Sequence, residues 1–175
     1  MKNCFVLLVK IGYEEKVAQI LKSKLEPSLF LPFIPSKEIL FRRNGITSKI
    51  NEICFRGYIF IESEHCIDEF IIRICPFIRM INEIYKIVNY GDKQDIAMRE
   101  NERTMLKGLY GSNYCIKGSV GFIESDRIRI IEGALMGIES IIKKINRHKR
   151  EAIIEIEFMG GLRQITVGLE IVEKI

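Results

Sequence analysis

The chain has 175 residues, of which 47% are hydrophobic and 29% are charged, and its formal net charge is +4. This composition excludes an intrinsically disordered chain. No apolar run approaches the about 20 residues that a membrane-spanning helix needs, and the start lacks the features of an export signal. We therefore expect a cytoplasmic protein without a membrane partner. Five cysteines without a CxxC pair argue against a zinc site and against a disulfide framework.

The first sixty residues predict a strand, a helix and a second strand. Residues 4–10 form a β-rich run that ends at Gly12, and residues 14–25 repeat apolar side chains at helical spacing. Residues 57–62 are apolar on both faces, which favours a central strand of a sheet. Between these elements, Asn44-Gly45 separates residues 39–43 from 46–53 and predicts a hairpin.

The next segment predicts two helices around a strand. Ser63 is a candidate cap for a helix whose apolar stripe ends at Cys75-Pro76. We expect a strand over residues 78–84 and a helix over residues 98–109.

From Val120 onward, helical periodicity gives way to short alternating strands. The alternation in residues 151–158 is typical of a small barrel with one buried face. The fold class that we expect is α+β, with an α/β domain followed by a β-barrel of about 55 residues. The expected strands cover residues 127–131, 138–145, 152–158, 164–167 and 169–172.

Catalytic chemistry is hard to build from this sequence. His65 and His148 are the only histidines, and neither lies in a nucleophile or metal motif. His65-Cys66 is a poor catalytic pair, since adjacent residues on a helix point about 100° apart. We expect no enzymatic activity, no metal and no cofactor.

The densest charge feature is the run Lys143-Lys144-Ile145-Asn146-Arg147-His148-Lys149-Arg150, which holds five lysine and arginine residues and links two expected strands. Such a loop can pair with successive phosphates of a nucleic acid. It can equally be a solvated hairpin tip whose lysines protect a sheet edge. The residues alone leave the two interpretations about even.

The first domain carries a surplus of large apolar residues on its expected sheet. If helices leave one sheet face open, these residues form a patch for a protein partner. If the third helix and the linker cover that face, they are ordinary core, and periodicity alone somewhat favours core. The residues are Phe5, Leu8, Phe55, Tyr58 and Phe60.

Four segments resemble, in the correct order, the NusG family of transcription elongation factors. Residues 4–17 (CFVLLVKIGYEEKV) are similar to the family's W-Y-V strand followed by G-x-E-x-x-V. Residues 55–61 (FRGYIFI) are similar to its F-P-G-Y strand. Residues 126–137 (DRIRIIEGALMG) resemble the start of a KOW barrel, and residues 167–174 (VGLEIVEK) resemble its last strand.

The resemblance implies two domains and a polymerase partner. An NGN domain of α/β sandwich type, an antiparallel sheet flanked by helices, would span residues 1–112, followed by a linker over 113–119 and a KOW domain with an SH3-like barrel over 120–175. The NGN domain would dock on the clamp helices of the largest RNA polymerase subunit. Its pocket would include Leu8, Phe55, Tyr58, Phe60 and Ile81.

The resemblance also implies contacts with nucleic acid. Lys10, Arg42 and Arg43 would face upstream DNA at the non-template strand. Within the family, the second domain looks most like the LoaP group of operon-specific antiterminators, which implies contact with structured leader RNA. The RNA-binding residues would be Lys143, Lys144, Arg147, His148, Lys149 and Arg150.

Three departures from the family pattern favour a specialised paralogue. Cys4 stands where the family usually has Trp, Arg56 where it has Pro, and Ser140 where the KOW motif has Gly. Two alternatives stay open. A general factor would contact ribosomal protein S10 or the Rho factor through its barrel, and a stand-alone RNA-binding KOW protein would not bind the clamp helices.

Overall fold

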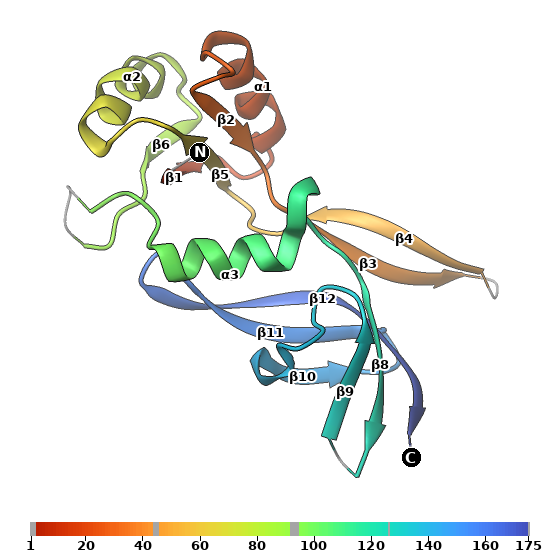
Figure 1. The fold of residues 1–175 in the computed structure, drawn as a ribbon. Coiled ribbons are helices and arrows are strands. Elements are labelled where there is room, and N and C mark those ends of the chain that lie inside the picture. The colour runs from red at the N-terminus through yellow and green to blue at the C-terminus, as the bar shows by residue number, and fades with distance from the viewer. Residues whose placement is uncertain (1–2, 44–45, 92–94, 126, 175) are drawn as a thin grey trace. The chain divides into compact units, whose positions relative to one another are not determined.

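The computed structural model describes residues 3–43, 46–91, 95–125 and 127–174 (Figure 1). They form two compact units. The first contains the residues up to Pro35 together with Phe55–Arg103, and the second contains Ser36–Cys54 together with the residues from Thr104 on. No helix in the described part of the chain is long and apolar enough to span a membrane.

The first unit is built on an antiparallel four-stranded sheet with the strand order β2-β5-β1-β6. Its strands are β1 (Asn3–Val9), β2 (Phe30–Phe33), β5 (Tyr58–Ser63) and β6 (Ile84–Ile87). Ile59, Phe60 and Ile61 of β5 are all fully buried. The prediction of a central strand that is apolar on both faces is therefore confirmed.

Two helices, α1 (Glu14–Lys24) and α2 (Ile67–Met80), pack on one face of this sheet (Figure 1). Alternate residues of β1 and β5 point toward them, and the ring of Phe5 stacks on that of Phe70 with centroids 3.7 Å apart. Each buried apolar side chain of this size contributes about 1.5–3 kcal/mol. The core includes Phe5, Leu7, Val9, Val17, Leu21, Ile59, Ile61, Phe70 and Ile74.

The boundaries predicted for α2 are wrong at both ends. The helix does not stop at Cys75-Pro76 but continues through Pro76 to Met80, and the expected strand over 78–84 is replaced by the later β6. Proline removes only one helical donor, while Phe77 and Ile78 beyond it pack on the core. The residue before the helix is Cys66, whereas Ser63 lies in β5 and its hydroxyl accepts a hydrogen bond from the His65 amide.

Glu14 joins the start of α1 to the turn before β5. Its side chain is only 2% exposed, and its two carboxylate oxygens accept hydrogen bonds from the amides of Gly12 and Gly57, both at 2.7 Å. Gly57 has φ +82°, and a Cβ there would meet the Val9 carbonyl oxygen at 3.3 Å. The G-x-E segment thus has a structural role, which is to satisfy two backbone donors, of which that of Gly57 is buried.

The second unit contains a three-stranded sheet around the predicted hairpin. Strand β3 (Ser36–Arg43) pairs with β4 (Ile46–Ile53) and, in parallel, with the short β7 (Cys115–Ile116). The hairpin strands are confirmed, and the predicted turn residues 44–45 lie outside the described residues. Because β3 pairs with β7, the hairpin groups with the second unit. The domain boundaries expected from the sequence stay a prediction.

The same unit contains a five-stranded sheet with the order β10-β11-β12-β8-β9. Its long strand, β12, pairs antiparallel with β11 and parallel with β8, so the strands expected over 164–167 and 169–172 are one element. The first residues of the strand expected over 138–145 form a short 3-10 helix, η2 (Glu139–Ile141). The strands are β8 (Ser119–Glu124), β9 (Arg127–Glu132), β10 (Ile142–Asn146), β11 (Glu151–Phe158) and β12 (Gly161–Lys174).

This sheet differs from the closed barrel that the sequence predicts. Among the described residues, the outer strands β9 and β10 do not pair with each other. The carboxylate of Glu139 in η2 accepts a hydrogen bond from the Ile130 amide of β9 at 3.2 Å. A side chain therefore occupies a position where a closing strand would have to accept.

The helix expected over 98–109 is confirmed as α3 (Glu100–Tyr110), which a one-turn 3-10 helix, η1 (Gly111–Asn113), extends. The first residues of α3 belong to the first unit and the remainder to the second. At its start, the Tyr90 hydroxyl donates a hydrogen bond to the buried carboxylate of Glu102.

Candidate functional site

Three phenylalanine rings form a cluster on the sheet face that points away from α1 and α2. The Phe60 ring lies 5.5 Å from that of Phe33 and 5.4 Å from that of Phe55, between ring centroids. All three residues are buried. Tilted rings at such separations attract each other beyond their burial, so the cluster stabilises the first unit.

The residues predicted to bind polymerase fall into three environments. Leu8 and Tyr58 are half-buried and lie opposite each other on β1 and β5. Phe55 and Phe60 are buried in the aromatic cluster. Ile81 packs into the helix-side core. The structure therefore brings Leu8, Tyr58 and Phe60 to one sheet face and places Ile81 on the other side of the sheet.

Cys4, which the sequence sets apart from its family, lies on the same face of β1 as Leu8. It is 1% exposed, and burial raises the pKa of its thiol to about 12. The thiol is therefore a protonated, apolar packing group at neutral pH.

The residues predicted to contact DNA are divided between the units. Lys10 follows β1 in the first unit, where its ammonium lies 4.8 Å from the centroid of the Tyr13 ring. Arg42 and Arg43 end β3 in the second unit, opposite Thr47 and Ile46. The side chains of these two arginines lie outside the described part of the chain.

We call residues 143–150 the basic loop; they form most of β10 and the turn that leads into β11. The turn has a defined backbone: Asn146 accepts a hydrogen bond from the Lys149 amide through its side chain, and the Arg150 amide donates to the Arg147 carbonyl. Arg150 adopts φ +54°, and its carbonyl accepts from the Leu169 amide at 2.8 Å. The side-chain oxygen of Asn146 thus serves the turn itself.

The cations of the basic loop differ in their neighbours. Lys143 pairs with Glu155 at 3.2 Å, and Arg150 pairs with Glu170 at 3.3 Å. Arg147, His148 and Lys149 are exposed, and within the described residues none of them forms an ion pair. The loop tip therefore projects positive charge that is not neutralised locally.

A groove lies between this loop and strand β3, within the second unit. Its volume is about 410 Å³, and it is lined by Ile39, Leu40, Phe41, His148, Lys149, Arg150 and Glu151. Phe41 is 49% exposed. The sequence analysis did not single out Phe41, although an aromatic residue beside Arg42-Arg43 at a hairpin tip is a usable signal for a nucleic-acid contact.

Glu38 lies on β3 next to the residues of that strand that line the groove. It is buried, and its carboxylate accepts hydrogen bonds from the Lys117 ammonium at 2.8 Å and the Gly118 amide at 3.0 Å, while the Lys49 ammonium lies 3.3 Å away. Burial raises the pKa of Glu38, but these three donors outweigh it and bring the pKa below 4.5. One carboxylate thus ties β3 to β4 and to the segment before β8.

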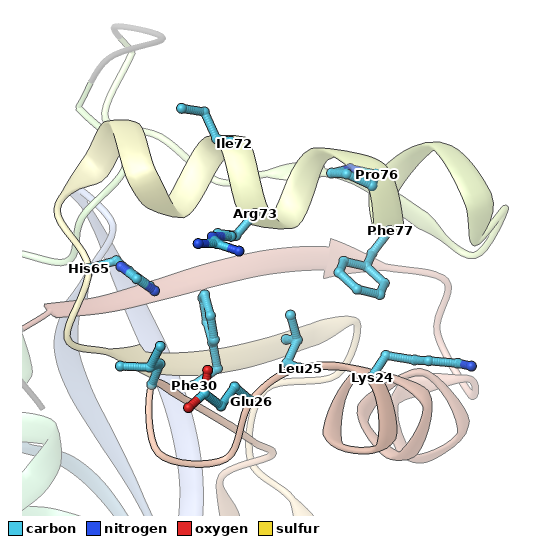
Figure 2. Close-up of a pocket in the computed structure, with 10 residues that line it drawn as sticks. Lys24, Leu25, Glu26, Phe30, His65, Ile72, Arg73, Pro76 and Phe77 are labelled. Carbon is cyan, nitrogen blue, oxygen red and sulfur yellow. The ribbon is translucent and has the colours of Figure 1, made fainter.

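A second cavity, of about 490 Å³, lies in the first unit between α2 and the segment that follows α1. Figure 2 shows Arg73 reaching from α2 toward Phe30 and His65, whereas Ile72 points outward. His65 stays close to Glu69, with Nδ1 3.1 Å from a carboxylate oxygen, and its ring lies 5.0 Å from that of Phe30. His65 is therefore part of the packing around Phe30.

Comparison with known proteins shows to which family this sequence belongs. The profile described as "Transcription termination factor nusG" matches residues 2–107, more than half of the chain. Proteins named "Transcription termination/antitermination protein NusG" from Streptococcus pyogenes serotypes M3 and M1 are 26% identical over 164 residues, covering 89% of this chain and 87% of each relative.

Among solved structures, a chain of the MjSpt4:Spt5 complex, conformation A, covers 95% of this chain and 99% of its own length at 14% identity, with a TM-score of 0.31. That score is too low to carry an argument about the fold. The sequence match rests on the first 107 residues and extends over most of the chain in the streptococcal relatives. The chain belongs to the NusG family of transcription termination and antitermination factors.

Proposed function

We propose that this chain binds transcribing RNA polymerase and promotes processive antitermination of specific operons, with RNA contact through its second domain. The observation that carries the proposal is the exposed tip of the basic loop, where Arg147, His148 and Lys149 form no ion pair among the described residues. A barrel that contacts ribosomal protein S10 mainly needs an apolar patch, whereas an RNA-binding barrel needs such a loop.

In this proposal, residues 1–112 form the NGN domain, residues 113–119 the linker and residues 120–175 an SH3-like KOW domain. Membership of the NusG family supports a polymerase partner. The half-buried pair Leu8 and Tyr58 is the accessible part of the clamp-helix pocket. Phe55 precedes β5 and its ring packs on that of Phe60, and its carbonyl accepts a hydrogen bond from the Tyr58 amide. Lys10, Arg42 and Arg43 contact the non-template DNA strand.

The factor acts by a population shift and not by a chemical step. Bound across the polymerase cleft, it favours the closed, elongating state over paused states. We therefore expect purified protein to show no turnover of nucleotides or nucleic acids. Nuclease or NTPase activity that disappears when residues of this chain are changed would contradict this part of the proposal.

The polymerase contact is tested by binding the full chain to purified clamp helices. Tyr58→Ala should weaken binding by about 1–2 kcal/mol, the effect of truncating an interface anchor. Tyr85→Ala is the matched control, because Tyr85 is a 58% exposed tyrosine on β6 of the same unit. Equal binding by the folded Tyr58 variant and the parent would remove the pocket assignment and favour a stand-alone RNA-binding KOW protein.

The RNA contact is tested by titrating the full chain with the structured leader RNA of a controlled operon at several salt concentrations. Arg147→Ala combined with Lys149→Ala should lower the salt slope of binding by roughly two units, one for each lost phosphate contact. Lys22→Ala combined with Lys24→Ala is the matched control, since it removes two exposed cations from α1. Equal effects of both double variants would favour the general factor that contacts ribosomal protein S10 or Rho.

A further inference from the structure

The groove between Phe41 and the basic loop combines an exposed aromatic ring with the ammonium of Lys149, which forms no ion pair among the described residues. We propose that it binds one unpaired nucleotide of RNA, with the base stacked on Phe41 and the adjoining phosphate at Lys149 and His148. This inference rests on the RNA contact of the proposed function and adds a base-binding residue to it. The groove has a volume of about 410 Å³, which falls in the range of pockets that bind small ligands.

The apolar wall of the groove comes from β3. Ile39 and Phe41 are two residues apart and so lie on one face of the strand, and half of the Phe41 surface is uncovered. Aromatic side chains with one free face are the usual platforms on which unpaired bases stack, and each stack contributes about 5- to 150-fold in affinity. A base inside a duplex is already stacked and is not available to such a ring.

The charged wall comes from the turn between β10 and β11. Arg150 is already paired with Glu170, and Glu151 adds a carboxylate at the same end of the groove. The phosphate site is therefore at Lys149 and His148. An acidic peptide would use the Lys149 ammonium but would leave the exposed ring of Phe41 without a matching planar group, so a nucleotide fits both walls better.

The two walls are held in place before any ligand binds. Glu38 ties β3 to Lys117 and Gly118, and a Cβ at Gly168 of β12 would lie only 2.8 Å from the Glu38 carbonyl oxygen. On the other side, the Leu169 amide holds the turn at Arg150. Such preorganisation reduces the entropy that binding would otherwise cost.

The test is titration of the full chain with a leader RNA hairpin that carries the fluorescent base 2-aminopurine in its unpaired loop. We expect binding of the parent to quench the fluorescence. Phe41→Ala should lose the quenching and about 5- to 150-fold in affinity, with the salt slope unchanged, whereas Phe41→Tyr should retain both. Lys149→Ala should lower the salt slope by roughly one unit. Tyr85→Ala, which removes a 58% exposed ring elsewhere, should change neither the affinity nor the salt slope.

The outcomes separate this inference from the function on which it rests. If Lys149→Ala weakens binding while Phe41→Ala does not, the RNA-binding loop stands and the groove proposal is wrong. If neither variant matters, both are wrong. Two further ligands complete the test: an RNA duplex without a loop, and single-stranded DNA of the loop sequence. If Phe41→Ala lowers the affinity for the duplex as much as the affinity for the hairpin, base stacking is excluded. If it lowers the affinity for single-stranded DNA equally, the assignment to RNA is wrong.

Discussion

The aromatic cluster of the first unit and the basic loop of the second are both candidates for partner binding, but they are built in opposite ways. Phe33, Phe55 and Phe60 are buried, and the rings of Phe33 and Phe55 both pack on that of Phe60, whereas Arg147 and Lys149 are exposed at the tip of a turn. A cluster of the first kind contributes to folding before it contributes to binding. A loop of the second kind is nearly neutral for folding, so a loss of function there reports on binding directly.

The largest expected effect is on the stability of the aromatic cluster. Phe60→Ala should reduce the free energy of unfolding by about 3–5 kcal/mol, because it leaves a cavity among packed rings. Phe41→Ala, which removes a half-exposed ring from the groove, should cost less than about 1 kcal/mol. Chemical denaturation of both variants measures the difference. If the two substitutions reduce the free energy of unfolding by similar amounts, the aromatic cluster does not contribute more to folding than the groove does.

A smaller effect is expected at the turn that supports β5. Glu14→Ala leaves the amides of Gly12 and Gly57 without their carboxylate acceptor, which should destabilise the chain by about 1.5–3 kcal/mol. Glu15→Ala is the matched control, since Glu15 is exposed in the same helical turn. If the Glu14 and Glu15 variants unfold with the same free energy, the two hydrogen bonds of Glu14 do not stabilise the turn before the strand that carries Tyr58.

At the groove, Glu38 predicts a pH-dependent effect. The pKa of Glu38 is lowered in the folded chain from its usual 4.5, so its ionised form stabilises the fold above pH 4.5, and this stabilisation is lost as the pH falls through the lowered pKa. Glu38→Gln should cost about 1 kcal/mol near neutral pH, a low value because both lysine partners are more than half exposed.

Denaturation of the parent and the Glu38→Gln variant across this pH range is the measurement. The cost of the substitution should shrink steadily as the pH falls below 4.5. A cost that stays constant with pH would show that packing, and not the charge of Glu38, holds the hairpin at the groove.

The smallest effect is expected in the basic loop. Lys143→Ala breaks an exposed ion pair with Glu155, and Arg147→Ala breaks none among the described residues, so both should change stability by less than about 1 kcal/mol. Their effects on RNA affinity should differ, because Lys143 is partly neutralised and Arg147 is not. Loss of stability in the Arg147 variant would mean that the loop is structural and would remove the contrast with the aromatic cluster.

The sequence by itself determined the elements whose signals are local. The spacing of apolar residues predicted α1 and α3, the pair Asn44-Gly45 predicted the hairpin strands, and the two-sided apolar run at 57–62 predicted β5. Alternation predicted β11 and β9, and the charge run at 143–150 predicted the loop that links β10 to β11. Each of these signals depends on the local spacing of apolar residues or on the cost of burying charge. Contacts with residues that are distant in the sequence rarely override such signals.

Only the tertiary structure decided the features that depend on distant partners. Core contacts of Phe77 and Ile78 carried α2 past Pro76, where the local signal predicted a stop. Glu139 accepts a hydrogen bond from the Ile130 amide of β9, and among the described residues β9 and β10 do not pair, in contrast to the predicted closed barrel. The groove joins Phe41 to Lys149 across more than a hundred residues. No local sequence pattern predicts that these two residues lie close together, because strand pairing and side-chain hydrogen bonds between remote segments determine their positions.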